Sequence, residues 1–163
     1  MMKAIFLDID GILNTYYTKE LTSTGSTFVD DKKLWILKEI IDRTGAKIVL
    51  SSTWRIGWKH LELGMKNTWY AKDFIELRDK FKEFGINLYD KTPILDKFMR
   101  RRGEEIKMYL DNNKDDIDGY VIIDDLPGKW LRPCSSHLLQ TSEYKGLQEK
   151  HIKVAERILN MEV

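Results

Sequence analysis

Three short apolar runs of this sequence each end in side chains that can act on a phosphate ester. The first ends in Asp8-Ile-Asp10-Gly11, which places two carboxylates two residues apart, followed by a glycine that permits a tight turn. Phosphoryl transfer through a covalent intermediate needs such a pair, because one carboxylate attacks phosphorus while the other gives a proton to the departing oxygen. We therefore predict that Asp8 is the nucleophile and Asp10 the general acid and base.

The second and third runs end in Ser51 and in the pair Asp124-Asp125. Because a phosphate dianion repels an attacking carboxylate, the site needs positive charge, and a hard cation bound by oxygen ligands supplies it. Magnesium is the expected cofactor. We expect Asp124 and Asp125 to join Asp8 around this ion, while the Ser51 hydroxyl donates a hydrogen bond to a phosphate oxygen.

A basic side chain should complete the contacts to phosphate, and four residues compete for this role. Arg102 is preferred because it begins a predicted helix, whose first amides and dipole also favour a phosphate group. Arg101, Lys91 and Lys129 are the alternatives. The run Lys97–Arg102 holds four basic residues in six, which is by default a solvated face, with contact to a nucleic-acid backbone as the alternative.

The candidate substrate-binding residues are Gly11, Ser52, Thr53 and Arg55. The hydroxyls of Ser52 and Thr53 are alternatives to that of Ser51, although hydroxyls at a strand end also satisfy backbone groups. Arg55 is expected to bind substrate, with an ion pair to a surface carboxylate as the simpler alternative.

The elements that position these residues fit an α/β fold with a central parallel sheet flanked by helices. Ligands of such folds bind outside the carboxyl ends of the strands, where the reactive strand ends can converge. The predicted strands, of which the first is central, are Lys3–Asp8, Ala46–Ser51, Ile86–Tyr89 at an edge, Tyr120–Asp124 and Ser136–Gln140. The predicted helices span residues 31–45, with Asp30 or Asp31 as cap and Leu34, Leu37 and Ile41 facing inward, and residues 71–84, 102–113 and 147–159.

Two irregular segments, at about residues 14–29 and 55–70, are predicted to form flaps beside the site. The second contains Trp58 and Trp69 and directly follows Trp54. These aromatic side chains suit either a small core, which we favour, or stacking on the bases of a single strand.

Composition indicates one domain over residues 1–163. A chain of this length with 42% hydrophobic residues can bury one ordinary core. The formal net charge of +1 gives no global reason to expect a nucleic-acid or membrane partner. A single cysteine, Cys134, excludes an internal disulfide, and no apolar run is long enough for a membrane span, so a cytoplasmic protein is expected.

Together, these motifs resemble those of the haloacid dehalogenase (HAD) superfamily of phosphohydrolases, in the same order along the chain. In that order they are Asp8-Ile-Asp10-Gly11, Ser51, a basic residue at a helix start and Asp124-Asp125. The basic residue departs from the pattern, since the family usually has lysine where Arg102 stands. The resemblance implies a Rossmann-like fold, a magnesium ion, the main-chain carbonyl of Asp10 among its ligands, and hydrolysis of the phosphoenzyme with Asp10 as base.

A narrower resemblance is to the HAD domain of Swiss Army Knife RNA repair proteins. It rests on Leu13-Asn14, Ser51-Ser-Thr-Trp-Arg55, Arg102-Gly-Glu-Glu-Ile106 and Lys145-Gly-Leu147. The segments where the superfamily inserts cap domains are short here, which implies a minimal cap or none. Open sites in this superfamily resemble those that act on large substrates such as nucleic-acid ends.

The leading functional prediction is therefore removal of phosphate from a nucleic-acid end, with a 3'-phosphate preferred. The alternatives are a small-molecule phosphatase such as a 5'(3')-nucleotidase, and a non-catalytic module that binds phosphorylated ends. The chain lacks G-x-x-x-x-G-K-[ST], the loop that holds ATP phosphates in polynucleotide kinases, so any repair kinase or ligase must be a separate partner.

Overall fold

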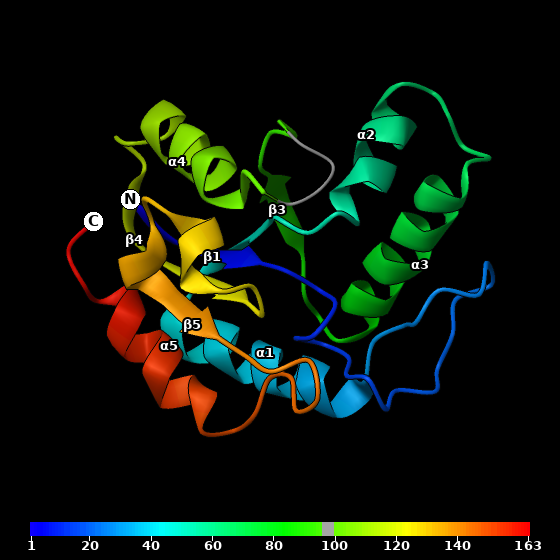
Figure 1. The fold of residues 1–163 in the computed structure, drawn as a ribbon, viewed down its shortest axis with the longest axis horizontal. Helices are drawn as coiled ribbons and strands as arrows, with labels where there is room; N and C mark the ends of the chain where they lie inside the picture. Colours follow the sequence, from blue (N-terminus) through cyan, green and yellow to red (C-terminus); the bar gives the residue numbers. More distant parts are fainter. Residues whose placement is uncertain (96–99) are drawn as a thin grey trace.

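At the centre of the computed structural model, which describes residues 1–95 and 100–163, lies a five-stranded parallel sheet (Figure 1). The strands are β1 (Met2–Leu7), β2 (Lys47–Leu50), β3 (Leu88–Lys91), β4 (Ile117–Asp124) and β5 (Leu138–Gln140). Their spatial order is β3-β2-β1-β4-β5, so the first strand is central, as predicted. This architecture confirms the Rossmann-like α/β fold.

The register of the sheet places the carboxyl ends of β1, β2 and β4 side by side. Leu7 of β1 lies opposite Leu50 of β2 and opposite Ile123 of β4. One residue further, the amide of Asp8 donates to the carbonyl of Ile123 at 3.0 Å, and the amide of Ser51 donates to the carbonyl of Leu7 at 3.0 Å. The residues that follow these three paired positions therefore meet at a single edge.

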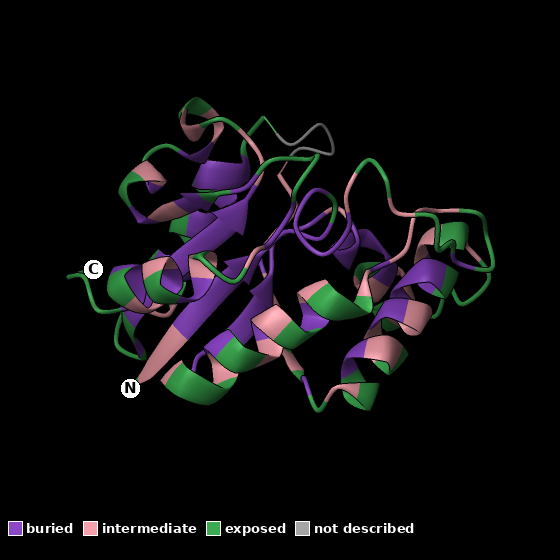
Figure 2. Ribbon diagram, turned by 90° about the horizontal axis from the view of Figure 1, so that it is seen from below, coloured by how far each residue is buried: buried purple, intermediate pink, exposed green. Residues whose placement is uncertain are grey.

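Helices cover both faces of the sheet. They are α1 (Asp31–Thr44), α2 (Arg55–Glu62), α3 (Trp69–Glu83), α4 (Arg102–Asn112) and α5 (His151–Leu159). Alternate residues of β1 face opposite sides, as the two-residue period of a strand requires. Ile5 and Leu7 join the core formed with α1, α3 and α5, whereas Ala4 and Phe6 join the core formed with α4. Figure 2 shows the strands buried beneath these helices.

The boundaries of α1 follow from local chemistry. Asp30 caps its first turn by accepting from the amide of Lys32, and Gly45 ends it in a left-handed conformation with φ of 68°. Leu34 and Leu37 are buried as expected, but the third fully buried position is Ile40, while Ile41 packs at the edge of the core.

The prediction of an irregular segment over residues 55–70 holds for residues 63–68 but is wrong for residues 55–62 and 69–70, which are helical. Residues 55–62 form α2, which packs beside α3 at the end of the sheet toward which the strands point (Figure 1). Gly57 explains the close packing, because a Cβ atom there would lie 2.0 Å from the carbonyl oxygen of Tyr70. A glycine inside a helix weakens a helix prediction, and its packing role becomes visible only in the fold.

The remaining boundaries differ by a few residues. Strand β3 begins at Leu88 and β4 at Ile117; β5 begins at Leu138 because residues 135–137 form a short 3-10 helix, and α5 begins at His151, directly after a turn at residues 149–150. Residues 14–29 carry an isolated bridge between Leu21 and Thr27 but no longer element, so within the described residues no cap domain intervenes between β1 and α1. None of the helices described has an apolar stretch long enough to cross a bilayer.

Candidate active site

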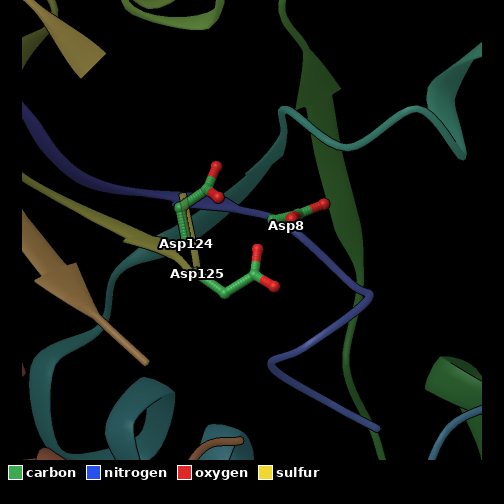
Figure 3. Close-up of side chains that lie close together, drawn as sticks. All are labelled: Asp8, Asp124 and Asp125. Carbon is green, nitrogen blue, oxygen red and sulfur yellow. The ribbon is translucent and has the colours of Figure 1, made fainter. Parts of the chain in front are cut away.

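Three carboxylates converge at the carboxyl edge of the sheet (Figure 3). Asp8 follows β1, Asp124 ends β4, and Asp125 comes next; each offers an oxygen, and these oxygens lie within 4.8 Å of one another. Asp8 and Asp124 are buried, and Asp125 is partly buried. Clustered carboxylate oxygens suit a hard divalent cation such as Mg²⁺, which would also relieve their mutual repulsion. Three of the four predicted metal residues, Asp8, Asp124 and Asp125, therefore lie together and fit such an ion, whereas the carboxylate of Asp10 is not part of this cluster.

Gly11 allows the first loop to approach this cluster. Its φ is 81°, which confirms the expected tight turn, and a Cβ atom there would lie 2.2 Å from Oδ2 of Asp125. Its amide donates to Asn14 Oδ1 at 3.0 Å, and its carbonyl accepts from the hydroxyl of Thr141 at 2.8 Å. Both backbone polar groups of Gly11 are thus engaged within the protein, so its role is to shape the loop.

Two residues of the acidic cluster, Asp124 and Asp125, have raised pKa values. Burial and the nearby charge of Asp8 raise the pKa of Asp124, although the Arg102 guanidinium opposes this shift. Burial, followed by the charge of Asp8, raises the pKa of Asp125 to about 6. Protons and a bound cation would therefore compete for these carboxylates.

Arg102 is the basic residue that reaches the cluster. Its Nη1 lies 2.7 Å from Oδ2 of Asp124 and 3.5 Å from Oδ2 of Asp8, and the residue is 1% exposed. Burial alone would lower the pKa of Arg102, but Asp8, Asp124 and Glu105 more than offset it, so the guanidinium stays charged. Its Nε and Nη2 have no hydrogen-bond partner among the described residues.

The three competing basic residues have other contacts. Arg101 is exposed and pairs with Glu104 at 2.7 Å. Lys91 pairs with Glu62 at 2.7 Å and lies over the ring of Trp58. Lys129 is exposed and lies over the ring of Trp130. In the basic run Lys97–Arg102, residues 97–99 lie outside the described residues.

Ser51 supplies a second buried donor. Its hydroxyl is fully buried and has no hydrogen-bond partner among the described residues. By contrast, the hydroxyl of Ser52 accepts a hydrogen bond from the amide of Trp54 at 3.2 Å. Ser52 thus satisfies a backbone group, as hydroxyls at a strand end commonly do. Thr53 is partly buried and lines a cavity beside Asp10. Of the three neighbouring hydroxyls, only that of Ser51 is both buried and without a partner among the described residues.

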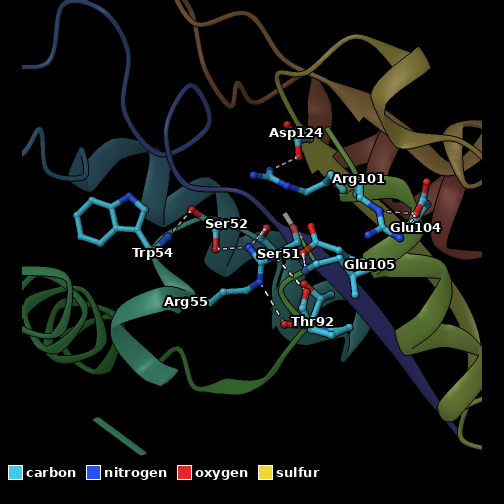
Figure 4. A network of polar contacts seen from close by, with 12 residues as sticks. Ser51, Ser52, Trp54, Arg55, Thr92, Arg101, Glu104, Glu105 and Asp124 are labelled. Atoms are coloured by element: carbon cyan, nitrogen blue, oxygen red, sulfur yellow. Dashed lines mark hydrogen bonds and ion pairs between the residues drawn. The ribbon is translucent and has the colours of Figure 1, made fainter. Parts of the chain in front are cut away.

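Arg55 has a position that does not fit the expected substrate contact. The residue is buried, and its guanidinium donates to the carbonyls of Ser51, Ser52, Thr92 and Pro93 (Figure 4). It also pairs with the buried carboxylate of Glu105 at 2.7 Å. All three nitrogens are thus engaged within the protein. Arg55 is a positioning residue that holds the loop after β2 against the loop after β3 and against α4.

Asp10 lies at the solvent side of the site. Its carboxylate accepts from Asn14 Nδ2 at 2.9 Å and from Trp54 Nε1 at 3.1 Å, while the residue as a whole is exposed. Partial burial of the carboxyl raises the pKa of Asp10, and the charge of Asp8 adds to this, whereas the hydrogen bonds from Asn14 and Trp54 lower it. A raised pKa suits a group that must carry a proton before it can donate one.

Asn14 and Trp54 are thus two site residues to which the sequence alone assigned no role. The spacing of four residues between Asp10 and Asn14 could have indicated a contact between the two side chains, but the same spacing also occurs in ordinary turns. Trp54 was interpreted as a core residue, and its ring is indeed buried, yet its indole N–H points to Asp10. Trp58 also packs inward, stacked on Phe74.

Comparison with known proteins places the chain in a family. Residues 4–152 match the family described as "HAD domain in Swiss Army Knife RNA repair proteins". No curated protein and no solved structure matches the chain. The matched segment covers most of the 163 residues and contains every candidate site residue from Asp8 to Asp125. The chain therefore belongs to the family of HAD domains of Swiss Army Knife RNA repair proteins.

Proposed function

We propose that this protein is a magnesium-dependent phosphomonoesterase that works through an aspartyl-phosphate intermediate. The observation that carries the proposal is a set of buried donors that have no partner among the described residues, the Ser51 hydroxyl and the Nε and Nη2 of Arg102, at the edge where Asp8 lies. A buried donor without an acceptor is costly, and a phosphate group attacked by Asp8 would supply the missing acceptors. Membership of a HAD family supports the same reaction.

The first half-reaction transfers phosphate to the enzyme. A carboxylate oxygen of Asp8 forms a bond to phosphorus as the bond to the leaving oxygen breaks, and Asp10 gives that oxygen its proton. Arg102 and Ser51 hold the phosphate oxygens in line for attack. Asp8, Asp124 and Asp125, with the carbonyl of Asp10 as the family resemblance implies, would hold a magnesium ion, whose charge would offset that of the phosphate.

The second half-reaction restores the enzyme. Asp10 is now a carboxylate and takes a proton from the attacking water, while the bond between phosphorus and Asp8 breaks. The products are inorganic phosphate, the free carboxylate of Asp8 and the protonated form of Asp10. One residue thus serves as acid and then as base, which suits its exposed position and its raised pKa.

We further propose that the substrate is a nucleic-acid end, with a 3'-phosphate preferred. The name of the matched family supports RNA repair as the setting. Exposed rings near the site support a polymer: Tyr16 and Tyr17 lie with Tyr144 in one cluster, with ring centroids 5.4–6.4 Å apart. The amide of Tyr16 donates to the carbonyl of Glu143, so two loops next to the site join here. Exposed aromatic faces suit stacking by unpaired bases.

The main alternative is a nucleotidase that acts on mononucleotides, which the cavity beside Asp10 would also serve. The third alternative is a module that only binds phosphorylated ends. The presence of both predicted catalytic carboxylates, Asp8 and Asp10, argues against it. Any repair kinase or ligase would be a separate partner. A cytoplasmic setting fits the single buried thiol, Cys134.

The deciding experiment measures phosphate release, with and without Mg²⁺, from matched oligonucleotides with a 3'- or 5'-phosphate and from mononucleotides. Asp8→Asn should abolish release and Asp10→Asn should slow it strongly, whereas Asp118→Asn, at an exposed position on β4, should have no effect. A preference for 3'-phosphorylated oligonucleotides supports the repair function. A preference for mononucleotides supports the nucleotidase, and unchanged release by Asp8→Asn would refute the covalent mechanism.

A further inference from the structure

A cavity of about 310 Å³ opens directly beside the general acid. Asp10 and Trp54 form one wall, residues 26–27 of the first flap segment form another, and Trp69, Tyr70 and Asp73 of α3 close it. In the proposed reaction Asp10 gives its proton to the oxygen that leaves phosphorus. The adjoining cavity is therefore the space available to the group that carries this oxygen.

The far wall of the cavity offers a flat aromatic surface. Trp69 is stacked on Tyr70, with ring centroids 3.7 Å apart and an angle of 25° between the planes. The ring of His60 meets Tyr70 edge-on at 5.6 Å, which holds the stack in place. Trp69 nevertheless remains 54% exposed. A tryptophan that lines a cavity, stacked on a neighbour and still open to solvent, can receive another planar ring.

The polar part of the wall has negative charge and hydroxyl groups. Asp73 is 4% exposed and accepts hydrogen bonds from the hydroxyls of Thr24 and Ser26. The lining formed by the described residues includes two carboxylates and no lysine or arginine. Such a wall disfavours a second phosphate and suits a neutral group whose hydroxyl or amino groups donate hydrogen bonds.

Contacts between the first flap segment and α3 fix the shape of the cavity. In addition to the bonds to Asp73, the amide and the hydroxyl of Ser23 both donate to the carboxylate of Glu76. The two walls are thus joined by side chains before any ligand binds. A binding site that is already shaped loses less conformational entropy when it is filled.

We propose that this cavity binds the nucleoside that carries the scissile phosphate, with the base stacked on Trp69 and the sugar next to Asp10. This inference rests on the proposed phosphatase function and names the leaving group. The volume is at the small end of the usual range for ligand pockets, about 300–1,000 Å³, and so suits one nucleoside. Because the described residues that line the cavity include no lysine or arginine, we place the next phosphate of a strand outside the cavity, on the open side at Trp69.

The test compares the hydrolysis of adenosine 3'-phosphate and glycerol 2-phosphate, two esters of secondary alcohols of which one carries a base. We expect Trp69→Ala to raise the KM for adenosine 3'-phosphate about tenfold more than the KM for glycerol 2-phosphate, because stacking on the base is lost. Trp69→Phe keeps a ring and should retain most of the preference. Trp35→Ala removes a similarly exposed tryptophan, 59% exposed on α1 and packed on Phe84, and should not alter the KM ratio.

The outcomes separate this inference from the proposed function. Equal changes in the two KM values in Trp69→Ala, or no change in either, would overturn the nucleoside site while leaving the phosphatase intact. If the wild-type protein hydrolyses neither ester, quenching of tryptophan fluorescence by adenosine 3'-phosphate decides the inference instead; the phosphatase function fails only if 3'-phosphorylated oligonucleotides release no phosphate either. Quenching that is kept in Trp35→Ala and lost in Trp69→Ala supports the site, whereas equal quenching in both variants overturns it.

Discussion

Arg102 donates from Nη1 to Oδ2 of Asp124 at 2.7 Å, so the first residue of α4 is tied to the last residue of β4 inside the site. The same guanidinium lies 3.5 Å from Asp8. One charged group therefore pairs with two of the clustered carboxylates and still keeps donors for a ligand. Arginine suits this position better than lysine, because its fork can contact a carboxylate and a phosphate together.

Replacing Arg102 tests this geometry. Arg102→Lys keeps the charge but loses the fork, and we expect kcat/KM for phosphate release to fall by about 10²-fold, in the range found when one preorganised donor is removed. Arg101→Ala is the matched control, because Arg101 is the neighbouring residue but is exposed and paired with Glu104. Equal loss of activity in both variants would show that general charge, rather than the fork of Arg102, matters.

Asn14 should set the pH range in which Asp10 holds its proton. The hydrogen bond from Asn14 lowers the pKa of Asp10, so Asn14→Ala should raise that pKa further. A general acid is active while protonated, and the alkaline limb of the kcat/KM profile that reports Asp10 should move to higher pH. Asn113→Ala is the control, since this amide donates only to the carbonyl of Tyr109 at the end of α4. An unshifted limb in Asn14→Ala would contradict the assignment of Asp10.

The sheet and the reactive strand ends could be predicted because they depend on patterns along the chain. Lys3–Asp8 is an apolar run that ends in acid, and the carboxyl ends of neighbouring parallel strands meet at one edge whatever the helices do. Asp8, Ser51 and Asp124 were therefore found together without knowledge of the loops. The cap at Asp30 and the stop at Gly45 were equally local and equally predictable.

What could not be predicted depends on contacts between distant segments. Arg55 stands in the same stretch as Ser51 and, by sequence, resembles a substrate contact; only the fold brings Glu105 from α4 within 2.7 Å of it. The helix at residues 55–62 was missed for a similar reason, because Gly57 is unfavourable in an isolated helix and useful only when α3 packs against it. Likewise, the sequence indicates that Trp54 is a core residue, and only the fold shows that its indole N–H donates to Asp10.

Asp125 should make Mg²⁺ binding sensitive to pH. Burial and the charge of Asp8 raise the pKa of Asp125 to about 6, and only the ionised carboxylate can bind the cation. The Mg²⁺ concentration that gives half-maximal activity should therefore rise as pH falls through 6. Asp125→Asn should weaken Mg²⁺ binding at pH 7, whereas Asp111→Asn, at an exposed residue of α4 paired with Lys107, should not. Isothermal titration with Mg²⁺ at pH 5, 6 and 7 would show the trend, and a constant affinity would contradict it.

The exposed tyrosine cluster should matter only for substrates long enough to reach it. Tyr16→Ala and Tyr144→Ala should each raise the KM for a 3'-phosphorylated oligonucleotide by about fivefold or more, because each removes one ring for base stacking. The KM for a mononucleotide should stay the same. Tyr89→Ala is the control, since Tyr89 is 51% exposed on β3 and its ring contacts Lys47. Equal effects on long and short substrates would argue against a strand-binding role.

The ion pair between Arg55 and Glu105 should contribute to the stability of the folded protein rather than to substrate binding. Both side chains are buried, and removing one partner from such a pair leaves an uncompensated charge, which costs about 3–5 kcal/mol. Arg55→Ala and Glu105→Gln should each lower the free energy of unfolding measured in urea, and their effects should be less than additive when combined, since both variants break the same contact. The exposed pair of Arg101 and Glu104 provides the comparison, because Arg101→Ala should change stability by under about 1 kcal/mol. If Arg55→Ala instead left stability unchanged and raised the KM, Arg55 would contact substrate, and the loop after β2 would need another residue to hold Ser51 in place.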